Sequence, residues 1–429
     1  MKSSLYNVIA EDENKLIIYN TRTGNHLVLV GDSAHYAKRI FADSSISEEN
    51  DLCAYLYANG FLIDSAEDEL ELVKAKRDIY INDNGLFLMI LPTEQCNFRC
   101  VYCYERFSNP MMSHLTVSKI KEFVSENLSL HDKLTVAWFG GEPMLAMDII
   151  DDLSHFFIKM CKKQRKPYFS MMTTNGSLLT PENWQRLKSD HITGYQITVD
   201  GLENTHDLQR ISVAGAPTWK TIISNLQYFR DKIYTSTINI ALRTNITKEI
   251  FQNYNEYLLF LKNEFGNDHR FHFFFHLAQD WGNLDGKDVK KSFCGTDEFY
   301  AVLNAAGKLG LPLSIHEYFI HPGARVCFAA KKNAYVFGSD GMVRKCSEHL
   351  YEDFNRLYDI NHPEERFESN EKFWNCATRG IPDECQSCIK LPLCYGLVCP
   401  AYRGDIKDTC GYDLSDMEKT IKAIYGYGG

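Results

Sequence analysis

The first eighty residues alternate short apolar stretches with polar turns and then change to longer helical patterns. Three stretches have the length and apolar content of strands: Leu5–Ile9, Lys15–Tyr19 and His26–Val30. Three later stretches favour helices: Ser33–Phe41, Glu48–Asn59 and the charged run Ser65–Tyr80. We therefore expect residues 1–80 to form a separate module, with a small three-stranded sheet followed by helices.

From Leu86 onward, short apolar runs alternate with longer amphipathic segments. The strand candidates are Leu86–Leu91, Leu134–Phe139, Tyr168–Thr173, Tyr195–Val199, Thr237–Leu242 and Arg270–Phe275. Six β–α repeats within about 190 residues favour an α/β fold with parallel strands and crossover helices. In such folds the functional loops follow the carboxyl ends of the strands.

The alternation fades from about His321, and cysteine, glycine and proline become more frequent. We expect a loop-rich segment there, and burial alone would stabilise it poorly. Metal sites would supply the missing stability. The pattern thus predicts three domains, at residues 1–80, 81–320 and 321–429.

Composition and charge exclude several classes of protein. The chain has 429 residues, 45% hydrophobic and 24% charged, and 46 basic against 56 acidic side chains give a net charge of −10. That balance argues against a general nucleic-acid-binding surface, which needs a basic face. No apolar run reaches about 18 residues, so no membrane span is expected. The start of the sequence, from Met1 to Ser4 onward, lacks an apolar signal core, which predicts a cytoplasmic protein.

Cysteine is the most informative residue type. The chain has 14, and eight of them fall between Cys327 and Cys410. Disulfides are not expected in a reducing cytosol, so closely spaced cysteines indicate metal or cluster ligands. The isolated Cys53, Cys161 and Cys294 are better explained as buried small hydrophobic residues.

Three cysteines follow directly after the first of the six strands. Cys96, Cys100 and Cys103 have the spacing Cys-x3-Cys-x2-Cys. Three thiolates on one short loop can hold three irons of a cubane cluster, and the fourth iron keeps an open coordination site. The loop resembles the signature of the radical S-adenosylmethionine enzymes. A zinc site or a chance triplet is the alternative, and the position after a barrel strand argues against both.

The resemblance implies both a fold and a chemistry. The fold would be a partial (β/α)6 barrel of the TIM type. The open iron would chelate S-adenosylmethionine, and an electron from the cluster would cleave it to a 5′-deoxyadenosyl radical that abstracts hydrogen from the substrate. The cofactor would carry the hard chemistry, and the barrel would position the reactants.

Further matches follow the later strands in the order that the family shows. Gly140-Gly141-Glu142-Pro143 resembles the family's Gly-Gly-Glu-Pro motif, and the resemblance implies that Glu142 receives the ammonium of the cosubstrate. Asn175 lies in a Thr-Asn-Gly segment after the third strand. The remaining residues expected near the cosubstrate are Thr198, Asp200, Arg210 and Arg243. Each motif taken alone can also be a turn or a helix cap.

His272 and His276 lie four residues apart on the last strand candidate and so share one face. A metal pair is possible there. Polar residues lining the barrel mouth, or histidines satisfied in the core, are the more ordinary explanation.

The C-terminal cysteines resemble the SPASM domain, the auxiliary-cluster extension of one radical S-adenosylmethionine subfamily. Gly341 and Cys346 match its Gly-x4-Cys element, and Cys385, Cys388 and Cys394 match its Cys-x2-Cys-x5-Cys run. The next spacing departs, because four residues instead of three separate Cys394 from Cys399. The whole resemblance covers Leu86 to Cys410.

Carried over residue by residue, the SPASM pattern implies two more 4Fe–4S clusters and so three in all. One would use Cys385, Cys388, Cys394 and Cys410. The other would use Cys327, Cys346 and Cys399, with Cys376 as the nearest spare thiol for its fourth ligand. Zinc is the rival interpretation, because Cys-x2-Cys pairs are typical of zinc sites.

The first eighty residues narrow the expected function. Many members of this subfamily modify ribosomally made peptides and carry a winged-helix-like precursor-recognition module, which residues 1–80 resemble in element order. Such a module binds a leader peptide by pairing it to a sheet edge. The resemblance therefore implies a peptide maturase that installs a thioether, carbon–carbon or ether crosslink. Its partners would be a precursor peptide with its leader and a reductant such as flavodoxin or ferredoxin.

Two other functions remain open at this stage. An anaerobic sulfatase-maturing enzyme would oxidise Cys or Ser to formylglycine, but Ser347 follows Cys346 where that group has an acidic base. A non-catalytic, zinc-stabilised scaffold is the alternative from another class. The sequence assigns no catalytic acid or base.

Overall fold

The computed structural model describes residues 1–12, 14–42, 50–280, 291–314, 320–374, 380–397, 401 and 416–427. The chain separates into two compact units, and each is built from segments far apart in the sequence. The first unit combines residues 1–83, 303–332 and 375–429, and the second combines residues 84–302 and 333–374. The three-domain division expected from the sequence remains a prediction.

The first unit contains the three-stranded antiparallel sheet expected near the N-terminus, in the order β2-β3-β4. Its elements are β1 (Lys2–Ser3), β2 (Asn7–Asp12), β3 (Lys15–Asn20), β4 (His26–Val30), α1 (Gly31–Ala42), α2 (Asp51–Ala58), β5 (Leu62–Ile63), α3 (Glu69–Ile81), α11 (Thr296–Lys308, which extends into it), η4 (Phe328–Ala330), η6 (Asp383–Cys385), α13 (Leu391–Cys394) and α14 (Met417–Tyr425). The first strand of this sheet, β2, begins at Asn7, two residues later than expected, because a turn precedes it. Leu16 and Ile18 of β3 pack with Leu56 of α2 in a buried core.

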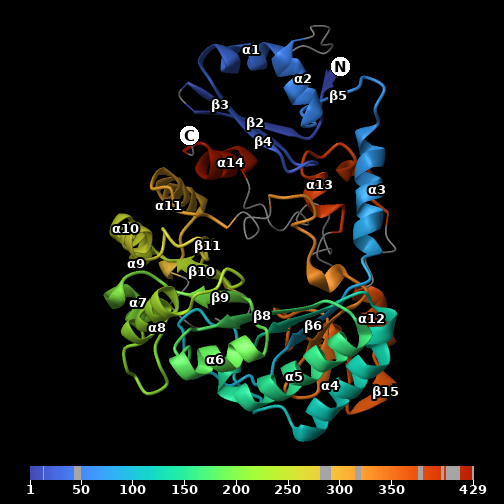
Figure 1. The fold of residues 1–429 in the computed structure, drawn as a ribbon, viewed down its shortest axis with the longest axis vertical. Helices are drawn as coiled ribbons and strands as arrows, with labels where there is room; N and C mark the ends of the chain where they lie inside the picture. The colour runs from blue at the N-terminus through green and yellow to red at the C-terminus, as the bar shows by residue number, and fades with distance from the viewer. Residues whose placement is uncertain are drawn as a thin grey trace. The chain divides into compact units, whose positions relative to one another are not determined.

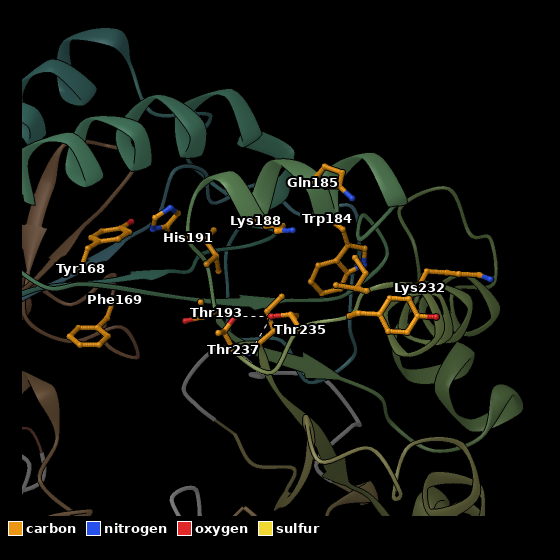
Figure 2. A pocket seen from close by; sticks show the side chains of 14 residues that line it. Tyr168, Phe169, Trp184, Gln185, Lys188, His191, Thr193, Lys232, Thr235 and Thr237 are labelled. Carbon is orange, nitrogen blue, oxygen red and sulfur yellow. Dashed lines mark hydrogen bonds between the residues drawn. The ribbon is translucent and has the colours of Figure 1, made fainter. Parts of the chain in front are cut away.

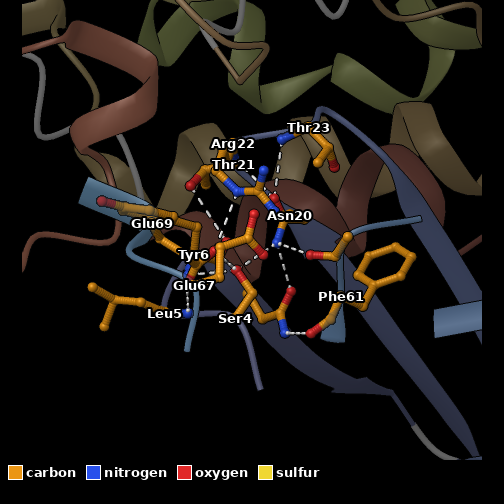
Figure 3. Close-up of polar contacts among 12 residues, drawn as sticks. Ser4, Leu5, Tyr6, Asn20, Thr21, Arg22, Thr23, Phe61, Glu67 and Glu69 are labelled. Atoms are coloured by element: carbon orange, nitrogen blue, oxygen red, sulfur yellow. Dashed lines mark hydrogen bonds and ion pairs between the residues drawn. The ribbon is translucent and has the colours of Figure 1, made fainter. Parts of the chain in front are cut away.

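A buried carboxylate ties the N-terminal segment to α3, as Figure 3 shows. Glu69 accepts hydrogen bonds from the Ser4 hydroxyl at 2.6 Å and from the Leu5 backbone N–H at 2.7 Å. The Arg22 guanidinium pairs with the same carboxylate at 3.2 Å. Asn20 donates from its amide to the Ser4 oxygen at 3.0 Å. Because each group has a partner, burial of this charge is compensated.

The C-terminal helix α14 completes the core beneath this sheet. The Tyr425 ring stacks on His26 of β4 with centroids 4.0 Å apart. Lys15 of β3 donates to the Gly426 carbonyl at 3.0 Å. Residues near both ends of the sequence therefore share one hydrophobic layer.

The second unit contains a ten-stranded sheet in the order β11-β10-β9-β8-β7-β6-β12-β13-β14-β15. Its strands are β6 (Leu86–Ile90), β7 (Leu134–Trp138), β8 (Tyr168–Thr174), β9 (Gly194–Thr198), β10 (Asn239–Ile246), β11 (Phe271–Leu277), β12 (Ala334–Phe337), β13 (Met342–Arg344), β14 (Arg356–Asp359) and β15 (His362–Arg366). All neighbours from β11 to β12 run parallel. The six parallel strands expected from the sequence are confirmed, and they form the α/β fold of a partial barrel.

Helices follow the strands as crossover connections, and Figure 1 shows α4, α5 and α6 along one face of this sheet. The helical elements are α4 (His114–Asn127), η1 (Leu128–Leu130), η2 (Pro143–Ala146), α5 (Met147–Gln164), α6 (Pro181–Ser189), α7 (Glu203–Gln209), α8 (Trp219–Lys232), α9 (Lys248–Gln252), α10 (Tyr254–Glu264), η5 (Asp353–Asn355) and α12 (Glu368–Trp374). Val117, Ile120 and Val124 of α4 are buried at the helical spacing read from the sequence. Among the described residues, no helix is long and apolar enough to cross a membrane.

The expectation of a loop-rich segment after about residue 321 was wrong for residues 334–366. Four strands lie there, and β12 extends the barrel sheet by pairing in parallel with β6. The strands are three to five residues long, which is too short to show a clear alternation. The next strands, β13 to β15, continue the sheet in antiparallel fashion.

Candidate functional site

The motifs singled out in the sequence gather at one edge of the second unit's sheet. They lie in the carboxyl-terminal parts of β6, β7, β8, β9 and β10 or in the loops that follow, and these strands run parallel. Parallel strands bring these ends to a common edge, where α/β folds build their sites. The candidate site is built entirely within this unit.

The loop after β6 holds Cys96, Cys100 and Cys103. Its turn is fixed by a hydrogen bond from the Cys103 N–H to the Cys100 carbonyl at 3.1 Å. The Cys96 sulfur accepts from the Phe98 N–H at 3.3 Å. Among the described residues, no three His, Cys, Asp or Glu side chains are arranged to hold one shared metal ion. In a cubane each cysteine binds a different iron, so such convergence is not required.

Burial controls the charge of these thiols. It raises the pKa of Cys96 and of Cys103 to about 12, and it raises the pKa of Cys100 as well. A thiolate at Cys100 would further raise the pKa of both neighbours, so the three groups interact electrostatically. The Arg210 guanidinium acts in the opposite sense on Cys96 and Cys100. A bound cation would therefore be needed to hold all three as thiolates.

The glycines after β7 let that loop lie against the cysteine loop. A Cβ on Gly140 would stand 2.4 Å from the Thr93 carbonyl oxygen, and one on Gly141 would stand 2.4 Å from that of Gln95. Both distances are far below van der Waals contact, so no side chain fits at either position. The Glu142 N–H completes the contact by donating to the Gln95 carbonyl at 2.9 Å.

Glu142 is fully buried and joins two of the motif loops. Its carboxylate accepts from the Thr174 hydroxyl at 2.8 Å, at the end of β8, and from the N–H of the next residue, Asn175, at 2.8 Å. It also accepts from the Met144 N–H at 3.1 Å, which caps the turn containing Pro143. Burial raises the pKa of Glu142 and these hydrogen bonds lower it. The expected contact with a cosubstrate ammonium remains a prediction.

Asn175 connects the third strand's loop to the cysteine loop. Its side-chain amide donates to the Asn97 oxygen at 2.7 Å and points at the Cys96 sulfur, 3.9 Å away. Asn97 in turn donates to the Ser177 hydroxyl at 2.9 Å. The sequence pattern singled out Asn175 but not Asn97. Asn97 lies between the ligand candidates Cys96 and Cys100, and that position could have indicated that it belongs to the site.

A buried charge network includes Tyr102 of the cysteine loop. Asp200 and Arg210 form an ion pair at 3.6 Å, and the Tyr102 hydroxyl hydrogen-bonds Asp200 and accepts from Arg210 at 2.7 Å. The Asn245 N–H donates to Asp200 at 2.7 Å. Burial raises the pKa of Asp200, and Arg210 opposes that effect. Tyr102 and Asn245 were not among the expected site residues, because only the fold brings them to Asp200.

One buried donor in this network has no partner. Among the described residues, the Nε of Arg210 makes no hydrogen bond, although its side chain is almost fully buried. A buried guanidinium with a free donor is suited to a carboxylate ligand. Three neighbouring thiols together with this donor fit a cluster and a cosubstrate that carries a carboxylate.

Thr198 and Arg243 lie opposite each other on β9 and β10. Arg243 donates to the Asn245 side-chain oxygen at 3.0 Å and lies over the Phe274 ring, 5.6 Å from its centroid. His276, on the same strand as Phe274, is buried, and its Nδ1 lies 2.6 Å from the Leu277 carbonyl. Burial lowers the pKa of His276 to about 4, which fits the expectation of a satisfied core histidine.

Two acidic residues that the sequence had not singled out lie close to these loops. Glu348 comes two residues after Cys346; burial raises its pKa, and Arg243 lowers it. Glu105 follows the cysteine loop, and burial next to Glu94 raises its pKa to about 8. The Tyr351 hydroxyl lies 3.3 Å from Glu105 and 3.4 Å from Glu94. Single acidic residues in loops give no sequence pattern that would reveal this proximity.

The C-terminal cysteines are described only in part. Cys385, Cys388 and Cys394 lie in the first unit, and the first two raise the pKa of Cys394, which burial brings to about 11. Cys327 lies in the first unit and Cys346 in the second. Three predicted ligands fall outside the described residues: Cys376, Cys399 and Cys410. The two auxiliary ligand sets remain predictions.

None of the motif residues lines the cavity of about 530 Å³ whose side chains Figure 2 shows. It is lined by Tyr168 at the start of β8, by Ile238 just before β10 and by Trp184 of α6. These residues mark the amino ends of the strands. The cavity therefore lies at the opposite end of the strands from the candidate site.

Comparison with known proteins identifies a domain within the chain. Residues 90–258 match the Radical SAM superfamily. The chain is 21% identical over 231 residues to the radical SAM cyclopropyl synthase TigE of Paramaledivibacter caminithermalis, covering 49% of this chain and 46% of that protein. It is 25% identical over 181 residues to a cysteine-type anaerobic sulfatase-maturating enzyme of Clostridium perfringens, covering 38% and 46% respectively.

A solved structure shows the same fold over most of the chain. Native anSMEcpe with bound AdoMet and Cp18Cys peptide superposes with a TM-score of 0.59 and 20% identity, covering 80% of this chain and 96% of that one. The chain thus carries a radical SAM domain, and members of that superfamily are enzymes. The superfamily implies a 4Fe–4S cluster and S-adenosylmethionine. The sequence matches span less than half the length of the two curated relatives.

Proposed function

We propose that this chain is a cytoplasmic radical S-adenosylmethionine peptide maturase. It abstracts hydrogen from a ribosomally made precursor peptide and installs a thioether, carbon–carbon or ether crosslink. The observation that carries the proposal is the convergence of Cys96, Cys100 and Cys103 with the loops of Glu142 and Arg210 at one sheet edge. When bound there, the cluster and S-adenosylmethionine supply the 5′-deoxyadenosyl radical.

The chain's own residues position the reactants. The three cysteines are the proposed ligands of the cluster. Arg210, held by Asp200 and Tyr102, offers a free donor to a cosubstrate carboxylate. Glu142 keeps the loops after β7 and β8 together, so the backbone of Gly140 and Gly141 stays next to the cysteine loop. The buried arrangement excludes water from the reacting groups.

The first unit is the proposed substrate-recognition part. Its three-stranded sheet offers the outer edge of β4, which pairs only with β3 among the described strands. An extended leader peptide adds to such an edge through main-chain hydrogen bonds. A peptide is also present in the anSMEcpe structure that shares the fold.

The C-terminal cysteines are the proposed ligands of two auxiliary 4Fe–4S clusters. Cys385 and Cys388 are close enough to Cys394 to raise its pKa, and Cys410 is the proposed fourth ligand. Cys327, Cys346 and Cys399 are the proposed ligands of the other cluster, with Cys376 as the candidate fourth. These clusters would accept the electron left after bond formation or bind the peptide.

Sulfatase maturation is the second candidate function. It is favoured by the likeness to the sulfatase-maturating relative and by Glu348, a half-buried acid whose pKa is raised by burial and lowered by Arg243. Ser347 directly after Cys346 argues against it. A zinc-stabilised scaffold without catalysis is the remaining alternative, and zinc without iron or sulfide in the purified protein would establish it.

The test is anaerobic incubation of the reconstituted protein with S-adenosylmethionine, dithionite and the peptide encoded beside it. We expect 5′-deoxyadenosine and a peptide lighter by about two mass units, the loss of two hydrogens on crosslinking. The Cys96→Ala/Cys100→Ala/Cys103→Ala variant should make no 5′-deoxyadenosine and should keep its C-terminal clusters. Unchanged cleavage by that variant would overturn the proposal, and a formylglycine product would favour the second candidate.

A further inference from the structure

A tyrosine hydroxyl in the core of the first unit has no hydrogen-bond partner. Tyr6 is fully buried, and among the described residues its hydroxyl makes no hydrogen bond. Burial raises the pKa of this hydroxyl to about 12, and the Glu69 carboxylate adds to that effect, so the group keeps its proton at neutral pH. A buried donor that is left unpaired is costly, which makes a ligand at this position favourable.

The core around Tyr6 includes two of the cysteines proposed to bind an auxiliary cluster. Tyr6 belongs to a buried apolar core with Leu391 and Tyr395, and Cys385 and Cys388 pack against that core. Besides burial, a thiolate at Cys388 would raise the pKa of the Tyr6 hydroxyl, so the two groups are near enough to interact electrostatically. The unpartnered donor and a proposed cluster ligand therefore share one small core.

Two hydrogen bonds connect Tyr6 to the residue next to Cys388. The Thr21 N–H donates to the Tyr6 carbonyl at 2.9 Å. The Thr21 hydroxyl donates to the carbonyl of Ile389, which directly follows Cys388, at 2.6 Å. These bonds run between segments that lie 368 residues apart in the sequence. The backbone of the cysteine segment is therefore fixed against the strand end that carries Tyr6.

The cysteine segment itself suits an iron–sulfur cluster. The Cys388 N–H donates to the Cys385 carbonyl at 3.1 Å, which closes a tight turn. Burial raises the pKa of Cys394 to about 11, and Cys388 and Cys385 add to that effect, so the three thiols are neighbours. Neighbouring cysteines of this kind are the usual donor set of such clusters. Arg77 of α3 holds the end of the segment by donating to the Tyr395 carbonyl at 3.1 Å.

We infer that Tyr6 donates a hydrogen bond from its hydroxyl to a sulfur of the auxiliary cluster bound by Cys385, Cys388 and Cys394. This inference rests on the proposed function, which assigns those ligands. Hydrogen bonds to the sulfurs of a cluster tune its reduction potential. The reduced cluster carries one more negative charge, so a donor stabilises it more than the oxidised form. Tyr6 therefore raises the potential and makes the cluster a better electron acceptor.

A redox titration of the reconstituted full-length protein, followed by electron paramagnetic resonance, tests the inference. The signal of this reduced cluster is the one that disappears when its three cysteines are replaced by Ala. Tyr6→Phe deletes only the hydroxyl. Tyr19→Phe is the matched control, because Tyr19 is also buried in the first unit but its hydroxyl donates to the Ile320 carbonyl. Neither S-adenosylmethionine cleavage nor peptide turnover enters the measurement.

We expect Tyr6→Phe to lower the equilibrium constant for one-electron reduction about tenfold, which corresponds to a potential lower by about 59 mV. Tyr19→Phe should keep the wild-type potential. In deuterated buffer, electron–nuclear double resonance of the wild-type cluster should show an exchangeable proton that Tyr6→Phe lacks. The titration reports only on molecules that hold the cluster, so a lower iron content in one variant does not alter the comparison.

Equal potentials in Tyr6→Phe and the wild type would overturn the inference, because the hydroxyl would then bond to water or to another part of the chain. An equal shift in Tyr19→Phe would also overturn it, since the effect would then be a general loss of packing. Zinc in place of iron at the three cysteines would overturn the assigned ligands as well. That outcome is distinguishable, because no signal of this cluster would appear in the wild type.

Discussion

Gly141 illustrates how a single missing side chain keeps two motif loops together. A Cβ there would lie 2.4 Å from the Gln95 carbonyl oxygen and 2.5 Å from that of Glu94. We expect Gly141→Ala to lower the free energy of unfolding by about 1–3 kcal/mol, because the backbone itself must shift. The displaced cysteine loop should also bind less iron.

Thermal unfolding and iron analysis test this expectation. Gly380→Ala is the control, since a Cβ at Gly380 meets nothing within 4 Å. Equal iron content and stability in the two variants would contradict the assigned role of Gly141.

Asp190 makes the stability of the second unit depend on pH. Burial and the neighbouring Asp151 carboxyl raise the pKa of Asp190 to about 8. Between about pH 4 and pH 8 the folded state therefore holds a proton that the unfolded state has lost, so stability falls as pH rises through this window. We expect Asp190→Asn, which is neutral at every pH, to flatten that slope.

Denaturant unfolding between pH 5 and pH 9 measures the slope. Asp353→Asn is the control, because the Asp353 side chain is 97% exposed. A wild-type stability that rises across this range, or an Asp190→Asn slope equal to the wild type's, would refute the account.

For individual residues, the sequence predicted the ligand candidates but not the side chains that surround them. Cysteine spacing and loop position do not depend on tertiary structure, so Cys96, Cys100 and Cys103 were recognisable. The partners of Glu142 come from a loop 32 residues away, and Tyr102 meets Asp200 across 98 residues. Such contacts depend on the packing of strands and carry no local signal.

Among the elements, the hydroxyl of Tyr102 links the cysteine loop to β9 and β10 through Asp200. We expect Tyr102→Phe to destabilise the protein by about 1–3 kcal/mol, because it leaves buried charged groups short of a hydrogen bond. Tyr234→Phe is the control, since Tyr234 is 89% exposed and its hydroxyl donates to the Asp231 carbonyl.

Denaturant unfolding and the electron paramagnetic resonance spectrum of the reduced cluster report on this link. The Tyr102→Phe spectrum should change, while that of Tyr234→Phe should not. Identical spectra and stabilities would show that the hydroxyl does not hold the loop.

The strands also show which elements the sequence can reveal. Each of the six parallel strands spans five to eight residues with a buried apolar set, so periodicity predicted them. By contrast β15 is exposed at all five positions, and β13 has three residues. These strands form because β12 extends an existing sheet edge. Their own composition does not specify them.

For the whole molecule, metal content is the decisive quantity. Three cubanes predict about twelve irons per chain after full reconstitution. Replacing Cys385, Cys388 and Cys394 by Ala should remove about four of these irons and leave 5′-deoxyadenosine formation measurable. Iron and sulfide assays with a parallel zinc measurement test this, and about four irons with one or two zincs would favour structural zinc in the C-terminal segment.

Deleting the proposed recognition module would also affect other parts of the first unit. Deleting residues 1–80 also removes the sheet on which α14 packs. We therefore expect the truncated protein to lose α14 protection in limited proteolysis, besides any loss of peptide binding. If α14 remains protected from proteolysis, the folding of α14 does not depend on residues 1–80.

The sharing of one core by the two ends of the chain has a consequence for synthesis. The part of β2 and β3 that α14 covers remains open until α14 leaves the ribosome, and translation at about 5–20 residues per second makes this delay roughly 20–80 s. The barrel sheet is also incomplete during this time, because β6 pairs with β12, which is synthesised much later. During that time apolar edges are open to aggregation. Slowing translation late in the message should therefore lower the soluble yield, and co-expressed chaperones should restore it.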